Sequence, residues 1–143
     1  FCMNISMRYF LILVVVSFSI FSFKYGFWSE ASEASDSKID TRAVSVLKGT
    51  ITHVRDGDTF EINRIPVRIS ALDCAENSTP EGKKITRFAK KFLGKQAVCE
   101  LTGAKTYDRV VGYCSIEGKD FARTVMNETS CKLWAKYDVW DRY

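Results

Sequence analysis

The chain has a single histidine, His53, among 143 residues. Histidine is the side chain that most often transfers protons in enzymes, and catalytic histidines usually act with a partner that orients them. Mechanisms that need two histidines are therefore excluded. No recognisable motif surrounds His53, and we interpret it as incidental to function.

The sequence also lacks closely spaced cysteine pairs. It contains five cysteines, and none of them forms a Cys-x-x-Cys pair. Structural zinc sites usually draw on such pairs, so a zinc site is disfavoured. In an exported chain the same cysteines would be free to form disulfides.

No apolar run is long enough for a typical membrane span. The run 9–23 has about fifteen residues, whereas a spanning helix needs about twenty and a signal-peptide core about seven to fifteen. We therefore expect residues 1–28 to be a signal peptide or, alternatively, an uncleaved membrane anchor. Either reading places the following domain outside the cytoplasm, secreted or periplasmic. The polar stretch 29–45 is typical of a linker.

The rest of the chain has the composition of one folded domain. Hydrophobic residues make up 46% of the sequence, and the net charge is +4. A moderately basic domain suits a polyanionic partner, although many unrelated domains are equally basic. We expect one domain over residues 46–143.

Alternating apolar residues predict five strands. Stretches 48–54 and 59–62 flank Asp56-Gly57, a strong hairpin signal. A third strand around 67–71 directs its aliphatic side chains to one face and Arg68 to the other. Two further strands are expected at 96–102 and 110–116. Five strands with a helix after the third predict an α+β, mainly β fold: an OB-fold, the five-stranded Greek-key barrel, with two or three helices.

The clearest helix is predicted over 78–93. Ser78 and Glu81 fit a capping box, and Gly94 suits the residue beyond the end. Its cations are interpreted as a solvated face or, alternatively, as a surface that follows phosphates, with Lys83 and Lys84 as candidate substrate contacts. A second, short helix is expected at 120–128.

The cysteine positions can be compared with the expected strands. In a hairpin centred near 106–107, Cys99 and Cys114 lie opposite each other, and the alternation of side chains directs both toward the core. We predict a Cys99–Cys114 contact that could be a disulfide, with Cys131 as the competing partner. Cys74 is expected to be unpaired.

Two acidic positions fall at expected strand ends. Asp58 ends the hairpin turn Asp56-Gly57-Asp58-Thr59, and Asp73 ends the third strand. Calcium and magnesium bind carboxylate and carbonyl oxygens, so these side chains could form part of a site for a hard cation. Taken alone, the acidic turn is more typical of a simple tight turn than of a metal site.

Three segments together resemble the thermonuclease (staphylococcal nuclease-like) family. They are the Asp56–Thr59 turn, the stretch Arg68-Ile69-Ser70-Ala71-Leu72-Asp73-Cys74-Ala75-Glu76, and Tyr107-Asp108-Arg109, which occur in the family's order. The resemblance implies that Asp58, Asp73 and the backbone carbonyl of Cys74 bind one calcium ion, with Asp56 helping through a water. It further implies roles for Glu76 as general base, for Arg68 and Arg109 as stabilisers of charge on phosphate, and for Tyr107 in the nucleotide pocket.

The resemblance implies a function as well. A member of this family would be a calcium-dependent endonuclease that hydrolyses DNA and RNA to 3′-phosphate products, preferring single or frayed strands. The alternatives are a non-catalytic OB-fold module that binds single strands, and an extracytoplasmic adaptor domain. We expect a monomer, in contact with a membrane only if the N-terminal segment stays uncleaved.

The sequence departs from the family pattern at three places. Ala75 replaces a proline before the glutamate, and Asp108 replaces a glycine beside Arg109. The Asp108 carboxylate could pair with Arg109 and weaken its hold on phosphate, or could orient it. Members of the family usually have a further C-terminal helix, so we expect the domain 46–143 either to be truncated at its C-terminus or to lack this last helix.

Overall fold

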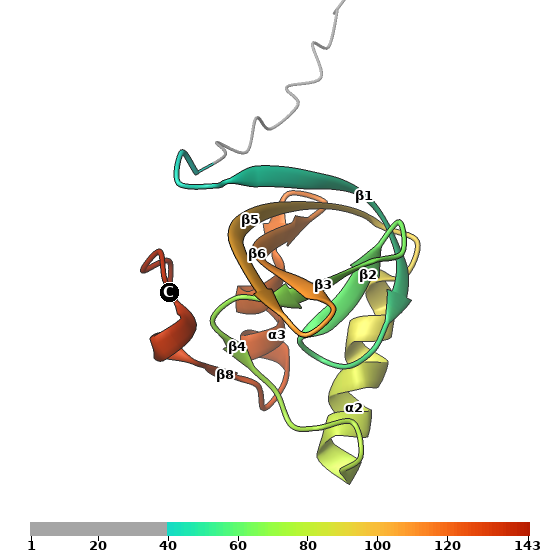
Figure 1. Cartoon of the computed structure of the whole chain (residues 1–143). Coiled ribbons are helices and arrows are strands. Elements are labelled where there is room, and N and C mark those ends of the chain that lie inside the picture. The colour runs from blue at the N-terminus through green and yellow to red at the C-terminus, as the bar shows by residue number, and fades with distance from the viewer. Residues whose placement is uncertain (1–39) are drawn as a thin grey trace, which may run out of the picture. The chain divides into compact units, whose positions relative to one another are not determined.

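The computed structural model describes residues 40–143. The predicted signal or anchor segment, 1–28, and most of the predicted linker lie outside them. Five strands form a closed, mainly β barrel with two helices, as Figure 1 shows, which is consistent with the predicted OB-like barrel. The barrel strands are β1 (Ser45–Val54), β2 (Thr59–Ile62), β3 (Ile65–Ile69), β5 (Gln96–Thr106) and β6 (Arg109–Ile116).

Closure of the barrel depends on one parallel pair. Neighbouring strands in the order β3-β2-β1-β5-β6 are antiparallel, and β3 then pairs with β6 in parallel, with Arg68 opposite Val111. Val67 and Ile69 of β3 are buried, whereas Arg68 points to the other face, as predicted. The strand ends at Ile69, earlier than expected, because Ala71 has a φ of 61°.

The β5–β6 hairpin confirms the predicted cysteine contact. Cys99 and Cys114 are partners in the ladder, their Cα atoms lie 4.1 Å apart, and they form a disulfide. A register shift between Leu101 and Lys105 lets the end of this hairpin extend beyond the barrel to Tyr107.

Helix α2 (Pro80–Ala89) continues into the 3₁₀ turn η1 (Lys90–Phe92). The predicted capping box is wrong by one residue, since Thr79 is the N-cap and accepts a hydrogen bond from the amide of Gly82 at 2.9 Å. A Cβ at position 82 would collide with the main-chain carbonyl of Glu76. Glycine therefore lets the 76–79 turn lie directly against the start of the helix.

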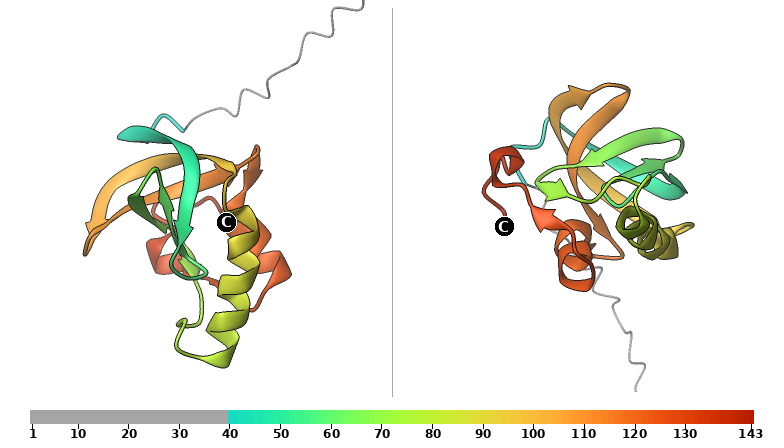
Figure 2. Two further views of the ribbon diagram at one scale, coloured as in Figure 1. Left: turned by 90° about the vertical axis from the view of Figure 1, so that its right-hand side faces the viewer. Right: turned by 90° about the horizontal axis from the view of Figure 1, so that it is seen from below.

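One hydrophobic core joins the barrel to both helices. Helix α3 (Phe121–Glu128), capped by Asp120, buries Phe121 against Phe60 of β2 in an edge-to-face contact of 5.1 Å. Ile85 and Ala89 enter the same core from α2. Figure 2 shows the two helices toward one end of the barrel. The remaining short elements are β4 (Leu72–Asp73), β7 (Lys119–Asp120), β8 (Lys132–Leu133) and η2 (Ala135–Tyr137).

The C-terminal segment packs against the barrel through aromatic and charged contacts. The ring of Trp140 stacks on that of Tyr113 with centroids 4.7 Å apart. The Arg142 guanidinium lies over both rings and pairs with Glu100 and with Asp40, the latter at 3.3 Å. Asp40 thus contacts the barrel, although the sequence predicts that the domain begins at residue 46. The helices of residues 40–143 are too short or too polar to span a membrane.

Candidate active site

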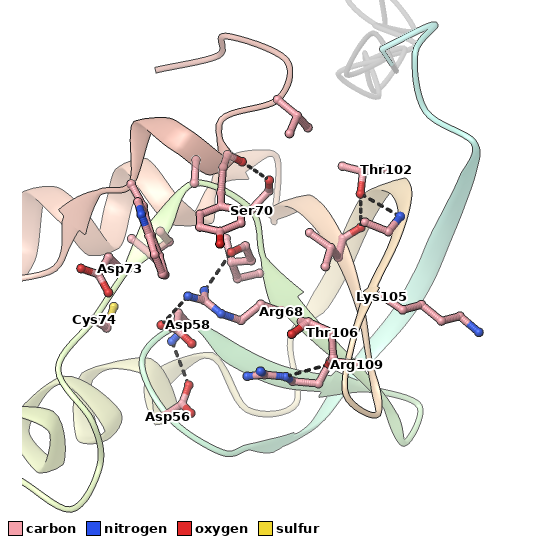
Figure 3. A pocket seen from close by; sticks show the side chains of 18 of the residues that line it. Asp56, Asp58, Arg68, Ser70, Asp73, Cys74, Thr102, Lys105, Thr106 and Arg109 are labelled. Atoms are coloured by element: carbon pink, nitrogen blue, oxygen red, sulfur yellow. Dashed lines mark hydrogen bonds and ion pairs between the residues drawn. The ribbon is translucent and has the colours of Figure 1, made fainter.

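The predicted functional side chains gather around one pocket. A cavity of about 1000 Å³ lies between the β5–β6 hairpin, the end of β3 and the C-terminal segment. Figure 3 shows Arg68 near its centre, with Asp58 and Asp56 below it and Arg109 to one side. The predicted residues that line this pocket are Asp56, Asp58, Arg68, Asp73, Cys74, Glu76, Tyr107 and Arg109.

Asp58 is the buried carboxylate of the pocket. It is 8% exposed, and its Oδ2 lies 3.1 Å from Nη2 of Arg68. Asp56 shapes the turn, since its Oδ1 accepts a hydrogen bond from the Asp58 amide at 3.1 Å. Burial raises the pKa of Asp58; the charge of Asp56 adds to this rise and the Arg68 guanidinium opposes it. A buried acid of this type is stabilised by further positive charge in the pocket.

Thr59 connects the two arginines of the site. Its hydroxyl donates to Oδ1 of Asp58 at 3.0 Å and accepts from Nη1 of Arg109 at 3.0 Å. Arg68 also donates to the Ile69 carbonyl at 2.9 Å. Both guanidiniums are therefore held by groups that surround Asp58. No role for Thr59 follows from the sequence, because the turn motif alone does not show that Arg109 reaches it.

Asp108 does not take Arg109 as its partner. Its carboxylate pairs with Nη1 of Arg55 at 2.8 Å, and Arg55 also bonds Glu61 at 3.0 Å. The Arg55 contact holds the pKa of Asp108 below its usual value. Arg109 keeps its contact with Thr59, and its guanidinium lies 5.8 Å from the ring centroid of Tyr107. The ring of Tyr107 itself is 94% exposed at the hairpin tip.

Asp73 is positioned by a short ladder that the sequence does not predict. Strands β4 and β8 pair Leu72 with Leu133 and Asp73 with Lys132. The next residue, Cys74, forms a disulfide with Cys131, with Cα atoms 4.4 Å apart. The expectation that Cys74 is unpaired is therefore wrong, as is Cys131 as a competitor for the Cys99–Cys114 pair. The error arises because the β4–β8 pairing brings together two cysteines that are 57 residues apart in the sequence.

Glu76 stands at the rim of the pocket. Its side chain is exposed, and its main-chain carbonyl accepts hydrogen bonds from the amide and hydroxyl of Thr79 at 2.9 and 2.8 Å. The start of α2 thus fixes the backbone at Glu76 while its carboxylate stays open to solvent.

Two predicted contacts do not belong to the pocket. Lys83 and Lys84 are exposed on α2 and are absent from its lining, and Nζ of Lys84 lies 3.8 Å from Glu81. The solvated-face reading fits this position better than a direct substrate contact. His53 is exposed on β1 and likewise lies outside the pocket lining.

The far wall of the pocket is aromatic, which sequence reasoning missed. Trp134 and Tyr137 line it, are 41% and 45% exposed, and meet edge to face at 4.4 Å. The buried Ser70 hydroxyl donates to the Tyr137 carbonyl at 2.7 Å and ties this segment to the end of β3. The only signal in the sequence is the aromatic-rich stretch 134–143, which gives no indication that it folds back over the pocket.

The donor chemistry fits a hard cation in part. Asp58 and Asp73 supply carboxylate oxygens, and Cys74 can supply its main-chain carbonyl because its sulfur is in a disulfide. Within residues 40–143, no three His, Cys, Asp or Glu side chains converge closely enough to hold a metal ion. Calcium commonly completes its coordination with water, so two carboxylates and a carbonyl would form one side of a site.

Comparison of the sequence with protein-family models and with curated proteins gives no match. The functional conclusion therefore depends on the chemistry of the pocket and on the sequence resemblance described above.

Proposed function

We propose that this domain is a calcium-dependent endonuclease that hydrolyses phosphodiester bonds of DNA and RNA and leaves 3′-phosphate ends. The observation that carries the proposal is that one pocket is lined by Asp58, Asp73, Glu76, Arg68 and Arg109. These residues come from three separate segments of the chain. A set of two acids, a third carboxylate and two guanidiniums is what phosphodiester hydrolysis without histidine requires.

The two arginines would bind the phosphate and stabilise the charge that grows on it. A guanidinium presents paired donors that match two phosphate oxygens. Arg68 and Arg109 are held in place by Asp58, Thr59 and the Ile69 carbonyl before substrate arrives. Fixed donors of this kind contribute about 10²- to 10³-fold in rate each.

Glu76 would take the proton from the attacking water. Its exposed carboxylate at the pocket rim is accessible to solvent, and its backbone is anchored by Thr79. A carboxylate is a weak base, so it is effective only when the water is polarised at the same time. Bound calcium supplies that polarisation and neutralises part of the phosphate charge.

The aromatic side chains suggest how the strand would lie. Tyr107 and Trp134 both line the pocket and expose their rings. Unpaired bases stack on such rings without regard to sequence. A single or frayed strand could place bases on these rings, which a closed duplex could not. This arrangement supports broad specificity for single-stranded DNA and RNA.

Two finer assignments follow from the same proposal. We assign the barrel to the OB-fold, as expected for a thermonuclease-like domain. Two disulfides within one small domain hint at an oxidising compartment, which supports a secreted or periplasmic location.

One observation favours a second candidate, a module that binds single strands without cutting them. The Arg68–Asp58 ion pair satisfies the buried carboxylate with a side chain of the protein itself. In a non-catalytic module this pair would replace the cation, and the pocket would bind phosphate and bases only.

A plasmid-nicking assay separates the two candidates. Purified protein should convert supercoiled DNA to nicked circles with calcium, and should stop when a chelator is added. Glu76→Gln should lower the rate at least about a hundredfold. The matched variant Glu128→Gln, at the exposed end of α3, should cut normally. Binding of single strands without any cutting at millimolar calcium would favour the binding module.

A further inference from the structure

The Cys74–Cys131 disulfide lies between the two acidic segments of the pocket. Cys74 directly follows Asp73, the last residue of β4. On its other side is the turn that carries Asp58. A Cβ built on Gly57 would lie 3.0 Å from the Cys74 sulfur, so this turn packs directly on the disulfide. Both carboxylates expected to bind calcium are therefore next to the same covalent bridge.

The Cys74–Cys131 disulfide is held firmly in the core at Cys131. Cys131 is 5% exposed and belongs to the main hydrophobic core. Its amide donates to the Thr129 hydroxyl at 3.2 Å, and that hydroxyl donates in turn to the Val125 carbonyl at 2.7 Å. Val125 is a fully buried residue of α3. The disulfide thus attaches the Asp73–Cys74 segment to the packed end of a helix.

Without the bridge, Asp73 would be held only from its N-terminal side, where Leu72 is buried in the core. Asp73 itself is exposed, and β4 and β8 contribute only two register pairs. The residues between Asp73 and the turn at Glu76 belong to no helix or strand. A stretch with so few contacts opens more readily than the packed core. The Glu76 end, by contrast, is fixed by Thr79 at the start of α2.

We infer that the Cys74–Cys131 disulfide positions the calcium-binding carboxylates, so that opening it weakens calcium binding while the barrel stays folded. This inference deepens the proposed function and rests on it. The role is indirect, because neither sulfur would touch the ion or the substrate. Groups that orient metal ligands typically change metal affinity about 10- to 100-fold when removed.

The second disulfide provides a matched control. Cys99 and Cys114 are almost completely buried in the β5–β6 ladder, which has seven register pairs of its own. Neither residue lines the pocket. Removing this bridge should lower stability without moving Asp58 or Asp73.

The test is calcium titration by calorimetry of wild-type protein and of two double variants, at a temperature where circular dichroism shows all three folded. Cys74→Ala with Cys131→Ala should weaken the calcium dissociation constant about tenfold or more. Cys99→Ala with Cys114→Ala should leave it within about threefold. Nicking by the first variant should recover at saturating calcium, whereas Asp58→Ala should not recover.

Reduction gives a reversible version of the same test and does not depend on the first variant folding. In the Cys99→Ala, Cys114→Ala protein, a dithiol donates two electrons and two protons to the Cys74–Cys131 bond, yields two thiols and closes to its own disulfide. Cys74 is partly exposed and so accessible to the reagent. Calcium affinity should fall on reduction and return on reoxidation.

The outcomes distinguish the inference from the proposed function. Wild-type protein that binds calcium and cuts DNA, together with unchanged affinity after loss of the Cys74–Cys131 bond, would overturn the inference alone. Equal loss of affinity in both double variants would also overturn it, since the effect would then be one of general stability. Wild-type protein that binds no calcium would overturn both.

Discussion

Arg55 and Asp108 form an ion pair of 2.8 Å at the base of the β5–β6 hairpin tip. The pair takes up the carboxylate that stands next to Arg109 in the chain. Arg109 is therefore directed to Thr59 and the pocket rather than to its neighbour. Neither of the two effects considered for Asp108 takes the form of a direct contact, since its carboxylate pairs with Arg55 and not with Arg109.

A first prediction tests whether Arg109 acts independently of Asp108. Asp108→Asn should change nuclease kcat/KM by less than about threefold, because Asp108 is exposed and pairs outside the pocket. Arg109→Ala should lower kcat/KM by about 10²- to 10³-fold, because it removes a fixed donor to phosphate. Initial rates on a single-stranded oligonucleotide at saturating calcium measure both. A large loss in Asp108→Asn would show that Asp108 does orient Arg109.

A second prediction concerns Thr59. Thr59→Val keeps the side-chain volume but removes the hydroxyl that joins Arg109 to Asp58. Losing a buried hydrogen-bonding group of this kind costs about 1–3 kcal/mol, so kcat/KM should fall about tenfold or more if the contact positions Arg109 for catalysis. The control is Thr52→Val, an exposed threonine of β1 outside the pocket lining. Equal rates for the two variants would show that Thr59 does not contribute to the active site.

The aromatic wall allows a third prediction. Trp134→Ala should raise KM for single-stranded oligonucleotides about tenfold with little change in kcat, because stacking contributes about 1–3 kcal/mol per base. Leu93→Ala is a suitable control, since this residue is 44% exposed and lies outside the pocket. A fall in kcat with constant KM would contradict a role in holding bases.

A fourth prediction addresses stability. Asp138 is 7% exposed, and its carboxylate accepts hydrogen bonds from the Tyr113 hydroxyl and from the amides of Arg142 and Tyr143, at 2.9 to 3.1 Å. Asp138→Ala would leave these donors without their acceptor and should lower the free energy of unfolding by about 3 kcal/mol.

Chemical denaturation monitored by tryptophan fluorescence would measure this loss, since Trp140 packs on Tyr113. Asp141→Asn, on an exposed neighbour, should change the free energy of unfolding by less than about 0.5 kcal/mol. A similar small change in Asp138→Ala would mean that the C-terminal segment contributes little to folding.

The features predicted well from the sequence are those set by local pattern. The alternation of Val67, Arg68 and Ile69 predicts which side chains of β3 are buried, and the Asp56-Gly57 turn predicts the first hairpin. The Cys99–Cys114 contact follows because both residues lie on one hairpin, where the turn position sets the register. Asp58, Arg68 and Arg109, which belong to the three motifs of the sequence, line one pocket.

The features missed are those set by contacts distant in sequence. Cys74 and Cys131 meet through two short strands whose sequences carry no pairing signal. Trp134 and Tyr137 reach the pocket because the chain after α3 turns back over the end of β3. Thr79, not Ser78, caps α2, and its hydroxyl and amide also donate to the Glu76 carbonyl. Local propensity does not predict such tertiary contacts.

The parallel pairing of β3 with β6 also limits how this protein can vary. Arg68 lies within the paired segment and Arg109 lies immediately before it, so the spacing of the two guanidiniums depends on where β6 begins. Side chains alternate along a strand, so deleting one residue from the 107–108 turn would send the second arginine to the opposite face. Changes in the length of the hairpin tip should therefore be rare among natural variants that remain active.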